Sequence, residues 1–169
     1  VGANDGMLHA FSADGDELFA YVPGSVSWTG LKSLSSTDYT HQYFVDGEIA
    51  VSTRQQTPDK NILVGALGRG GRALYALDVT DPENFAAGKV LWEFKHADLG
   101  NVLTRPVITK VTTQDGTVPA VIVGNGYNSD GQKAALFVIN LETGDLISRI
   151  DTGVGSATGP LTRTTSAPA

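Results

Sequence analysis

The sequence has no cysteine among its 169 residues. Disulfides, thiolate metal sites and cysteine nucleophiles are therefore excluded. No stretch approaches the ~18 consecutive apolar residues that a membrane helix needs, so we expect no membrane insertion. Basic clusters are also missing, with 12 Lys and Arg against 18 Asp and Glu and a net charge of −6. Because a nucleic-acid-binding face is basic, we expect no nucleic acid partner.

Glycine is the residue that is abundant, with 20 of 169 positions. Hydrophobic residues make up 41% of the chain, which is enough for a packed core. Because glycine weakens helices, its abundance between short apolar runs favours strands joined by many turns. The chain opens on Val1 rather than Met, and we interpret it as an internal fragment of a longer protein.

Three segments of the chain begin alike, with Val-Gly followed by a glycine-rich turn and an alternating strand. Their leading glycines, Gly2, Gly65 and Gly124, are about 60 residues apart, longer than common propeller repeats. Gln114-Asp115-Gly116 and Glu142-Thr143-Gly144 are typical hairpin turns. The alternation predicts strands at residues 43–51, 62–65, 73–78 and 90–94, then at 106–111, 120–124, 134–140 and 145–150.

These repeats predict an all-β, β-propeller-like fold with four-stranded antiparallel blades. The first repeat begins within its second strand and two complete repeats follow, so the chain holds about two and a half blades. We expect a partial β-propeller domain at residues 1–155 and a polar, flexible tail at 156–169. A partial propeller leaves blade faces uncovered, so we also expect self-association or low solubility.

The strings GANDGMLHAF, HQYFVDGEIAVS, ILVGALGRGGRALYALDVTDPE and VIVGNGYNS, in this order, resemble the PilY/PilC family of type IV pilus proteins. The resemblance implies a C-terminal β-propeller of an exported Gram-negative protein at the pilus tip, cell surface or outer membrane. It implies a non-enzymatic, adhesin-like role in pilus assembly, surface adhesion and twitching motility. The implied partners are pilins, minor pilins or other pilus-tip proteins, and a host or abiotic surface.

Calcium binding is a further property of that family, through an Asp-x-Asp-x-Asp loop that this chain lacks. We therefore expect no cofactor in this fragment, although the parent protein could bind calcium. Two oxygen-rich clusters are candidate calcium sites, and we interpret both as turns in which the side chains bond nearby backbone. The clusters are Asn125, Asn128 and Asp130, and Asp78, Asp81 and Glu83.

An enzyme of the quinoprotein class is the first rival interpretation, because NDGMLHAFSADGDELF resembles the repeats of pyrroloquinoline-quinone dehydrogenases. In those repeats a Trp docks adjacent blades, and we expect Trp92 to pack between sheets in this way. A pure outer-membrane scaffold propeller is the second rival. His9, His41 and His96 lack a catalytic motif around them, so the sequence predicts no catalytic residue.

Three side chains are candidates for partner binding: Trp28, Arg69 and Arg72. Trp28 lies in the mostly polar insertion 25–40, which we expect to be a protruding loop. There it is either a cap on the propeller edge or an interface anchor. Arg69 and Arg72 flank glycines in the predicted turn after residue 65, and are either partner contacts or two solvated arginines.

Overall fold

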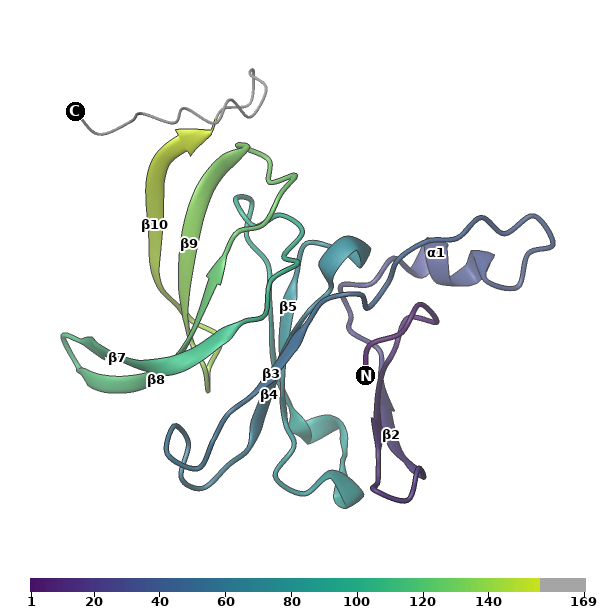
Figure 1. Cartoon of the computed structure of the whole chain (residues 1–169), viewed down its shortest axis with the longest axis horizontal. Coiled ribbons are helices and arrows are strands. Elements are labelled where there is room, and N and C mark those ends of the chain that lie inside the picture. The colour runs from purple at the N-terminus through teal and green to yellow at the C-terminus, as the bar shows by residue number, and fades with distance from the viewer. Residues whose placement is uncertain (156–169) are drawn as a thin grey trace.

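A computed structural model describes residues 1–155, which form three antiparallel sheets that lie side by side in chain order (Figure 1). The first sheet pairs β1 (Leu8–Phe11) with β2 (Glu17–Tyr21). The second is β3 (Ile49–Val51), β4 (Ile62–Ala66), β5 (Leu74–Asp78) and β6 (Val90–Phe94), and the third is β7 (Val107–Thr113), β8 (Gly116–Gly124), β9 (Lys133–Asn140) and β10 (Leu146–Gly155). The helices are α1 (Trp28–Ser33) and the 3₁₀ turns η1 (Gly68–Gly70), η2 (Pro82–Asn84) and η3 (Ala87–Lys89).

The strand order confirms the predicted four-stranded antiparallel blades. In both complete sheets each strand pairs with the next one along the chain. Gly2 bridges to Leu8, so the chain start lies where another strand of the first sheet would pair. The two hairpin turns are also confirmed, since Gly116 and Gly144 adopt φ of 121° and 78°. The predicted tail at 156–169 lies outside the described residues.

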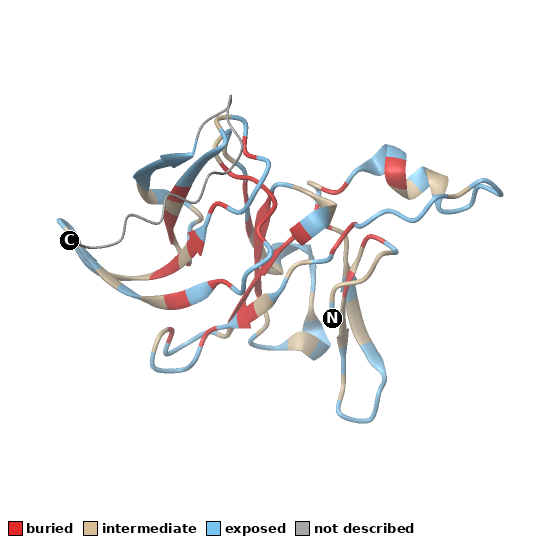
Figure 2. Cartoon of the chain, turned by 45° about the horizontal axis from the view of Figure 1, so that its top comes forward, coloured by how far each residue is buried: buried red, intermediate tan, exposed pale blue. Residues whose placement is uncertain are grey.

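Strand β5 is buried on both faces, which confirms that a sheet lies on either side of it. Leu74 and Ala76 belong to a core shared by the second and third sheets. Tyr75 and Leu77 belong to a second core, shared with the first sheet. Buried residues accordingly concentrate in the middle sheet (Figure 2). The second sheet is thus the centre around which the other two are packed.

Trp92 on β6 joins the second sheet to the third, as predicted. Its indole Nε1–H donates to the backbone oxygen of Leu141 at 2.9 Å. The ring packs on Gly144 so closely that a Cβ added there would lie 2.6 Å from Trp92 Cγ. The indole therefore docks one blade against the β9–β10 turn of the next.

The first strand of the second sheet is shorter than predicted, because residues 43–48 leave the sheet. Asp46 N–H donates to Leu67 O at 3.1 Å, while Phe44 and Val45 are buried at 1% exposure. Because these two residues are consecutive and both buried, their hydrophobicity reflects packing into the core beside the first sheet and not the alternation of a paired strand. The prediction that 43–48 is a strand is wrong for this reason.

The insertion before β3 is not only a loop, since it contains the helix α1. Ser27 caps this helix by accepting a hydrogen bond from Gly30 N–H at 3.1 Å. Leu31 packs on the turn at Gly6. The insertion does project from the sheets, as Figure 1 shows. None of the helices within residues 1–155 has the length and hydrophobicity needed to span a membrane.

The third sheet has a face with exposed apolar side chains turned away from the second sheet. Val107, Ile122 and Val138 lie opposite one another on it, beside the Leu136–Ile150 pair. Val107 and Ile150 are 57% and 49% exposed. Uncovered apolar surface of this kind drives association.

We expect chain 1–169 to self-associate through this face, and Val107→Lys with Ile150→Lys to reduce the association. Size-exclusion chromatography with light scattering measures the change in mass. A wild-type chain that stays monomeric at all concentrations would contradict this expectation.

Candidate partner-binding surface

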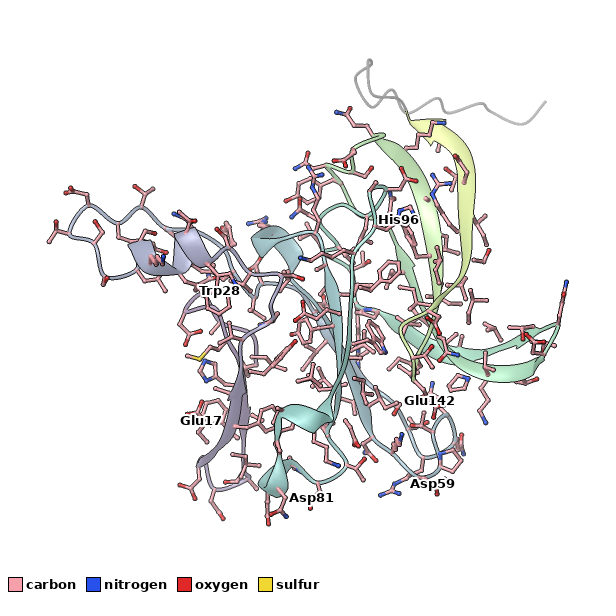
Figure 3. The ribbon with its side chains drawn as sticks, turned by 180° about the vertical axis from the view of Figure 1, so that it is seen from behind. Glu17, Trp28, Asp59, Asp81, His96 and Glu142 are labelled. Atoms are coloured by element: carbon pink, nitrogen blue, oxygen red, sulfur yellow. The ribbon has the colours of Figure 1, made fainter. Side chains whose placement is uncertain are left out.

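Four connections meet at one end of the blades. In antiparallel sheets the connections after even-numbered strands lie at one end, here residues 22–48, 67–73, 95–106 and 125–132. We call this the loop end, and the end with the odd-numbered connections the turn end. Figure 3 shows Trp28 and His96 at the loop end, and Asp59, Asp81 and Glu142 at the turn end.

Asn101 ties three of these connections together. Its Nδ2–H donates to Gly68 O at 2.8 Å, and its backbone N–H donates to Tyr127 O at 2.7 Å. The residue is only 9% exposed, so these bonds satisfy polar groups that water does not reach. These three connections are therefore tied to one another and are not independent loops.

Asn125 acts in the same way within the third sheet. Its Nδ2–H donates to Asp98 O at 2.8 Å and to Lys133 O at 2.7 Å, and its Oδ1 accepts from Ala135 N–H at 3.0 Å. Both ends of the amide are thus bonded to backbone. These partners are 8 to 27 residues away and not in the neighbouring turn backbone that we expected, and that Asn125 binds no calcium stays a prediction.

Glu93 holds the segment at Gly24 and Ser25 where the insertion begins, which we call its first stem. The sequence did not single out Glu93. Its carboxylate accepts hydrogen bonds from Tyr21 Oη at 2.7 Å, Gly24 N at 2.5 Å and Ser25 Oγ at 2.6 Å. Burial acts to raise the pKa of Glu93, but the bonds from Ser25, Tyr21 and Gly24 outweigh it and hold the pKa below its ordinary value. Burial and then the Glu93 contact raise the pKa of Tyr21.

Replacing Glu93 by Ala is expected to loosen this stem and to cost about 1 kcal/mol, because three donors lose a charged acceptor at a site that water partly screens. Because the folded-state pKa is lowered, the stabilisation is present above the unfolded value of about 4.3 and is lost as pH falls through the folded value. Hydrogen exchange of Gly24 and Ser25 amides measures the loosening. The matched control is Glu83→Ala, which removes an exposed acid in η2, and equal exchange in both variants would contradict the role of Glu93.

Trp28 begins α1 and is 59% exposed. Within residues 1–155 it therefore covers little of the core, and its indole is available at the loop end. Its role as a partner contact stays a prediction.

The two candidate arginines have different surroundings. Arg72 donates to Asp130 at 2.5 Å, which ties the β4–β5 connection to the β8–β9 connection. Arg69 instead donates to Tyr43 Oη at 3.0 Å and lies over the Tyr43 ring. Both arginines are exposed, Arg72 in a surface ion pair and Arg69 against a tyrosine, and whether either one contacts a partner stays a prediction.

The three histidines all make local contacts. His9 places Nδ1 2.5 Å from Glu17 Oε1 and Nε2 2.8 Å from Asp5 Oδ2, and the bonds to Glu17 and then Asp5 raise its pKa. His96 Nδ1 accepts from the backbone N–H of Asp98, and His41 lies edge-on to a tyrosine. That none of them is catalytic stays a prediction.

The second calcium candidate is not assembled as a site. Asp78 accepts from the N–H of Thr80 at 3.0 Å and pairs with Lys89 at 3.3 Å, while Asp81 accepts from Asn84. In the described part of the chain no three His, Asp or Glu side chains gather in a way that could hold a metal ion. That this chain binds no cofactor stays a prediction.

Blade-like sheets that pack in chain order identify the chain as part of a β-propeller. A family model described as the PilY1 beta-propeller domain matches residues 1–167. The chain belongs to this family, which confirms the resemblance in the sequence.

Two curated relatives carry the name of a pilus factor. A "Type IV pilus biogenesis factor PilY1 homolog" of Xylella fastidiosa is 46% identical over 155 residues, which cover 89% of this chain and 10% of the relative. The "Type IV pilus biogenesis factor PilY1" of Pseudomonas aeruginosa PAO1 is 40% identical over 158 residues, which cover 89% of this chain and 13% of the relative. The chain thus spans only 10% to 13% of these relatives.

A solved structure shares the fold. The crystal structure of the Pseudomonas aeruginosa PilY1 C-terminal domain matches with a TM-score of 0.67 and 37% identity, over 92% of this chain and 31% of that chain. The match is consistent with a partial propeller.

Proposed function

We propose that this chain is a non-enzymatic module of a type IV pilus biogenesis and tip-adhesin protein, and that it works through protein–protein contacts at its loop end. The observation that carries the proposal is the fixed network of Asn101 and Glu93, which holds exposed side chains in place. A binding surface gains from such preorganisation, because little order is lost on association. Trp28, Tyr43 and Arg69 are the side chains offered.

The partners that we propose are pilins, minor pilins or other pilus-tip proteins, together with a host or abiotic surface. The names of the relatives, which are type IV pilus biogenesis factors, support pilus-related partners. We further propose that the parent protein is exported to the pilus tip, cell surface or outer membrane of a Gram-negative bacterium. Support for adhesion and twitching motility would follow from these contacts.

A complementation experiment tests this function. The double variant Trp28→Ala, Arg69→Glu in the full-length protein is expected to reduce surface pili and twitching zones while its cellular level stays normal. The control is Asp115→Ala at the β7–β8 turn, on the turn end, which is expected to leave both unchanged. Normal piliation of the double variant would contradict the proposal.

A binding assay separates this function from its rivals. The proposal predicts that pyrroloquinoline quinone with Ca²⁺ gives no absorbance change or thermal shift, which a quinoprotein dehydrogenase would give. It also predicts that the soluble domains of pilins or minor pilins are retained by the immobilised protein. A pure scaffold would retain none of them.

A further inference from the structure

Arg69 and Tyr43 form a compact exposed pair at the loop end. The guanidinium NH1 donates to Tyr43 Oη at 3.0 Å, and its Cζ lies 5.1 Å from the centre of the Tyr43 ring. His41 packs edge-on against the same ring, with 4.9 Å between centroids. Tyr43 remains 38% exposed, so the pair faces solvent. The guanidinium plane is thus oriented by aromatic contacts and keeps further N–H donors free for a ligand.

The charge of Arg69 is not neutralised by an ion pair. Arg72 and Arg149 both have a carboxylate within 4.0 Å, whereas no carboxylate of residues 1–155 lies that close to Arg69. Asp46 is near enough to act on Arg69 through its charge, but not to bond it. Arg69 is therefore an oriented cation with open capacity for an anion.

The backbone that carries Arg69 is held rigidly. Gly70 packs against the carbonyl of Phe44, where a side chain would overlap, and Gly68 O accepts from the buried amide of Asn101. A fixed backbone lowers the entropy that binding must overcome. The pair is preorganised for this reason.

Charge is distributed unevenly between the two ends of the blades. Every connection at the turn end carries at least one acid, so an acidic partner is repelled from that end. The loop end also carries acids, but there the five acids Asp38, Asp46, Glu48, Asp98 and Asp130 are balanced by the five bases Lys32, Arg69, Arg72, Lys95 and Arg105. The acids of the five turn-end connections include Asp14, Asp59, Asp81, Asp115 and Glu142.

We infer that Arg69 and Tyr43 form a carboxylate-recognition site that binds an acidic side chain on the surface of a partner protein. The inference rests on the proposed function in taking the loop end as the contact surface. A guanidinium presents two parallel N–H donors that match a carboxylate, and this geometry gives specificity as well as affinity. Tyr43 orients the guanidinium and offers its ring edge to the partner.

Surface plasmon resonance tests the inference with this chain immobilised sparsely, so that its copies do not meet. The probe is a peptide of alternating Glu and Gly, and the matched peptide replaces each Glu by Gln. We expect the Glu peptide to bind, and Arg69→Ala to weaken it about tenfold, as the loss of one charge-assisted interaction implies. Arg72→Ala is expected to leave binding unchanged because Arg72 is already paired with Asp130. Tyr43→Phe is expected to weaken binding less than Arg69→Ala.

Three outcomes would overturn the inference. They are equal binding of the Gln peptide, equal loss in Arg69→Ala and Arg72→Ala, and tighter binding of inorganic phosphate than of the Glu peptide. The result is also separable from the proposed function. Selective Glu-peptide binding together with normal piliation of the Trp28→Ala, Arg69→Glu variant would reject the pilus role and retain carboxylate recognition.

Discussion

Replacing Trp92 by Ala is expected to lower the free energy of unfolding by about 3–5 kcal/mol, the range for a buried Trp truncated in a core. The indole is only 8% exposed and is the side chain of β6 that bonds Leu141 across the sheet interface. Its removal leaves a cavity beside Gly144 and an unpaired carbonyl. Denaturant unfolding followed by circular dichroism measures the loss.

Trp28→Ala is the matched control, because it removes the other of the two tryptophans, from an exposed position. We expect it to change stability by less than about 0.5 kcal/mol. Each variant keeps one tryptophan, so the fluorescence of Trp92 and Trp28 can be read separately. Equal stability of the two variants would show that Trp92 does not dock the blades.

Replacing Gly70 by Ala is expected to destabilise the chain by about 3 kcal/mol, at the upper end of overpacking costs. The added Cβ would overlap the carbonyl of Phe44, and its distance to Phe44 Cα would be 2.5 Å. Since both partners are backbone, no rotamer change relieves the clash. The segment around Phe44, where the chain returns from the insertion, would then separate from η1. Arg69 would lose its position over Tyr43.

Gly88→Ala supplies the control for this prediction. Gly88 also lies in a 3₁₀ turn, η3, but a Cβ there meets nothing within 4 Å. We expect this variant to be neutral or slightly stabilising, because alanine restricts the unfolded chain. Thermal unfolding compares the two variants, and a Gly70→Ala protein as stable as Gly88→Ala would rule out the close packing at Phe44.

Part of the fold could be predicted from the sequence because it depends on patterns among neighbouring residues. Alternation and hairpin turns identified β4, β5, β6 and β9 to within a residue or two. The strand boundaries failed at residues 43–48, where the consecutive residues Phe44 and Val45 are both buried and the backbone bonds loop residues. Periodicity reports which side chains are buried and not what buries them.

The candidate site could be predicted only in part, because sequence patterns do not report contacts between residues far apart in the chain. Composition and turn position pointed to Trp28, Arg69 and Arg72, but nothing nearby distinguished Arg69 from Arg72. Their difference depends on Asp130, which is 58 residues from Arg72. Glu93 gave no sequence signal at all, since its donor Tyr21 is 72 residues away.

The sequence by itself determined the repeated strands, the turns between them and the family, because these depend on neighbours along the chain or on recurring strings. Only the tertiary structure decided which polar groups meet, and so which charges are neutralised and which remain available. Glu93, Asn101 and Asp130 each bond a group far away in the sequence. Blade packing brings these groups together, and no local pattern encodes that packing.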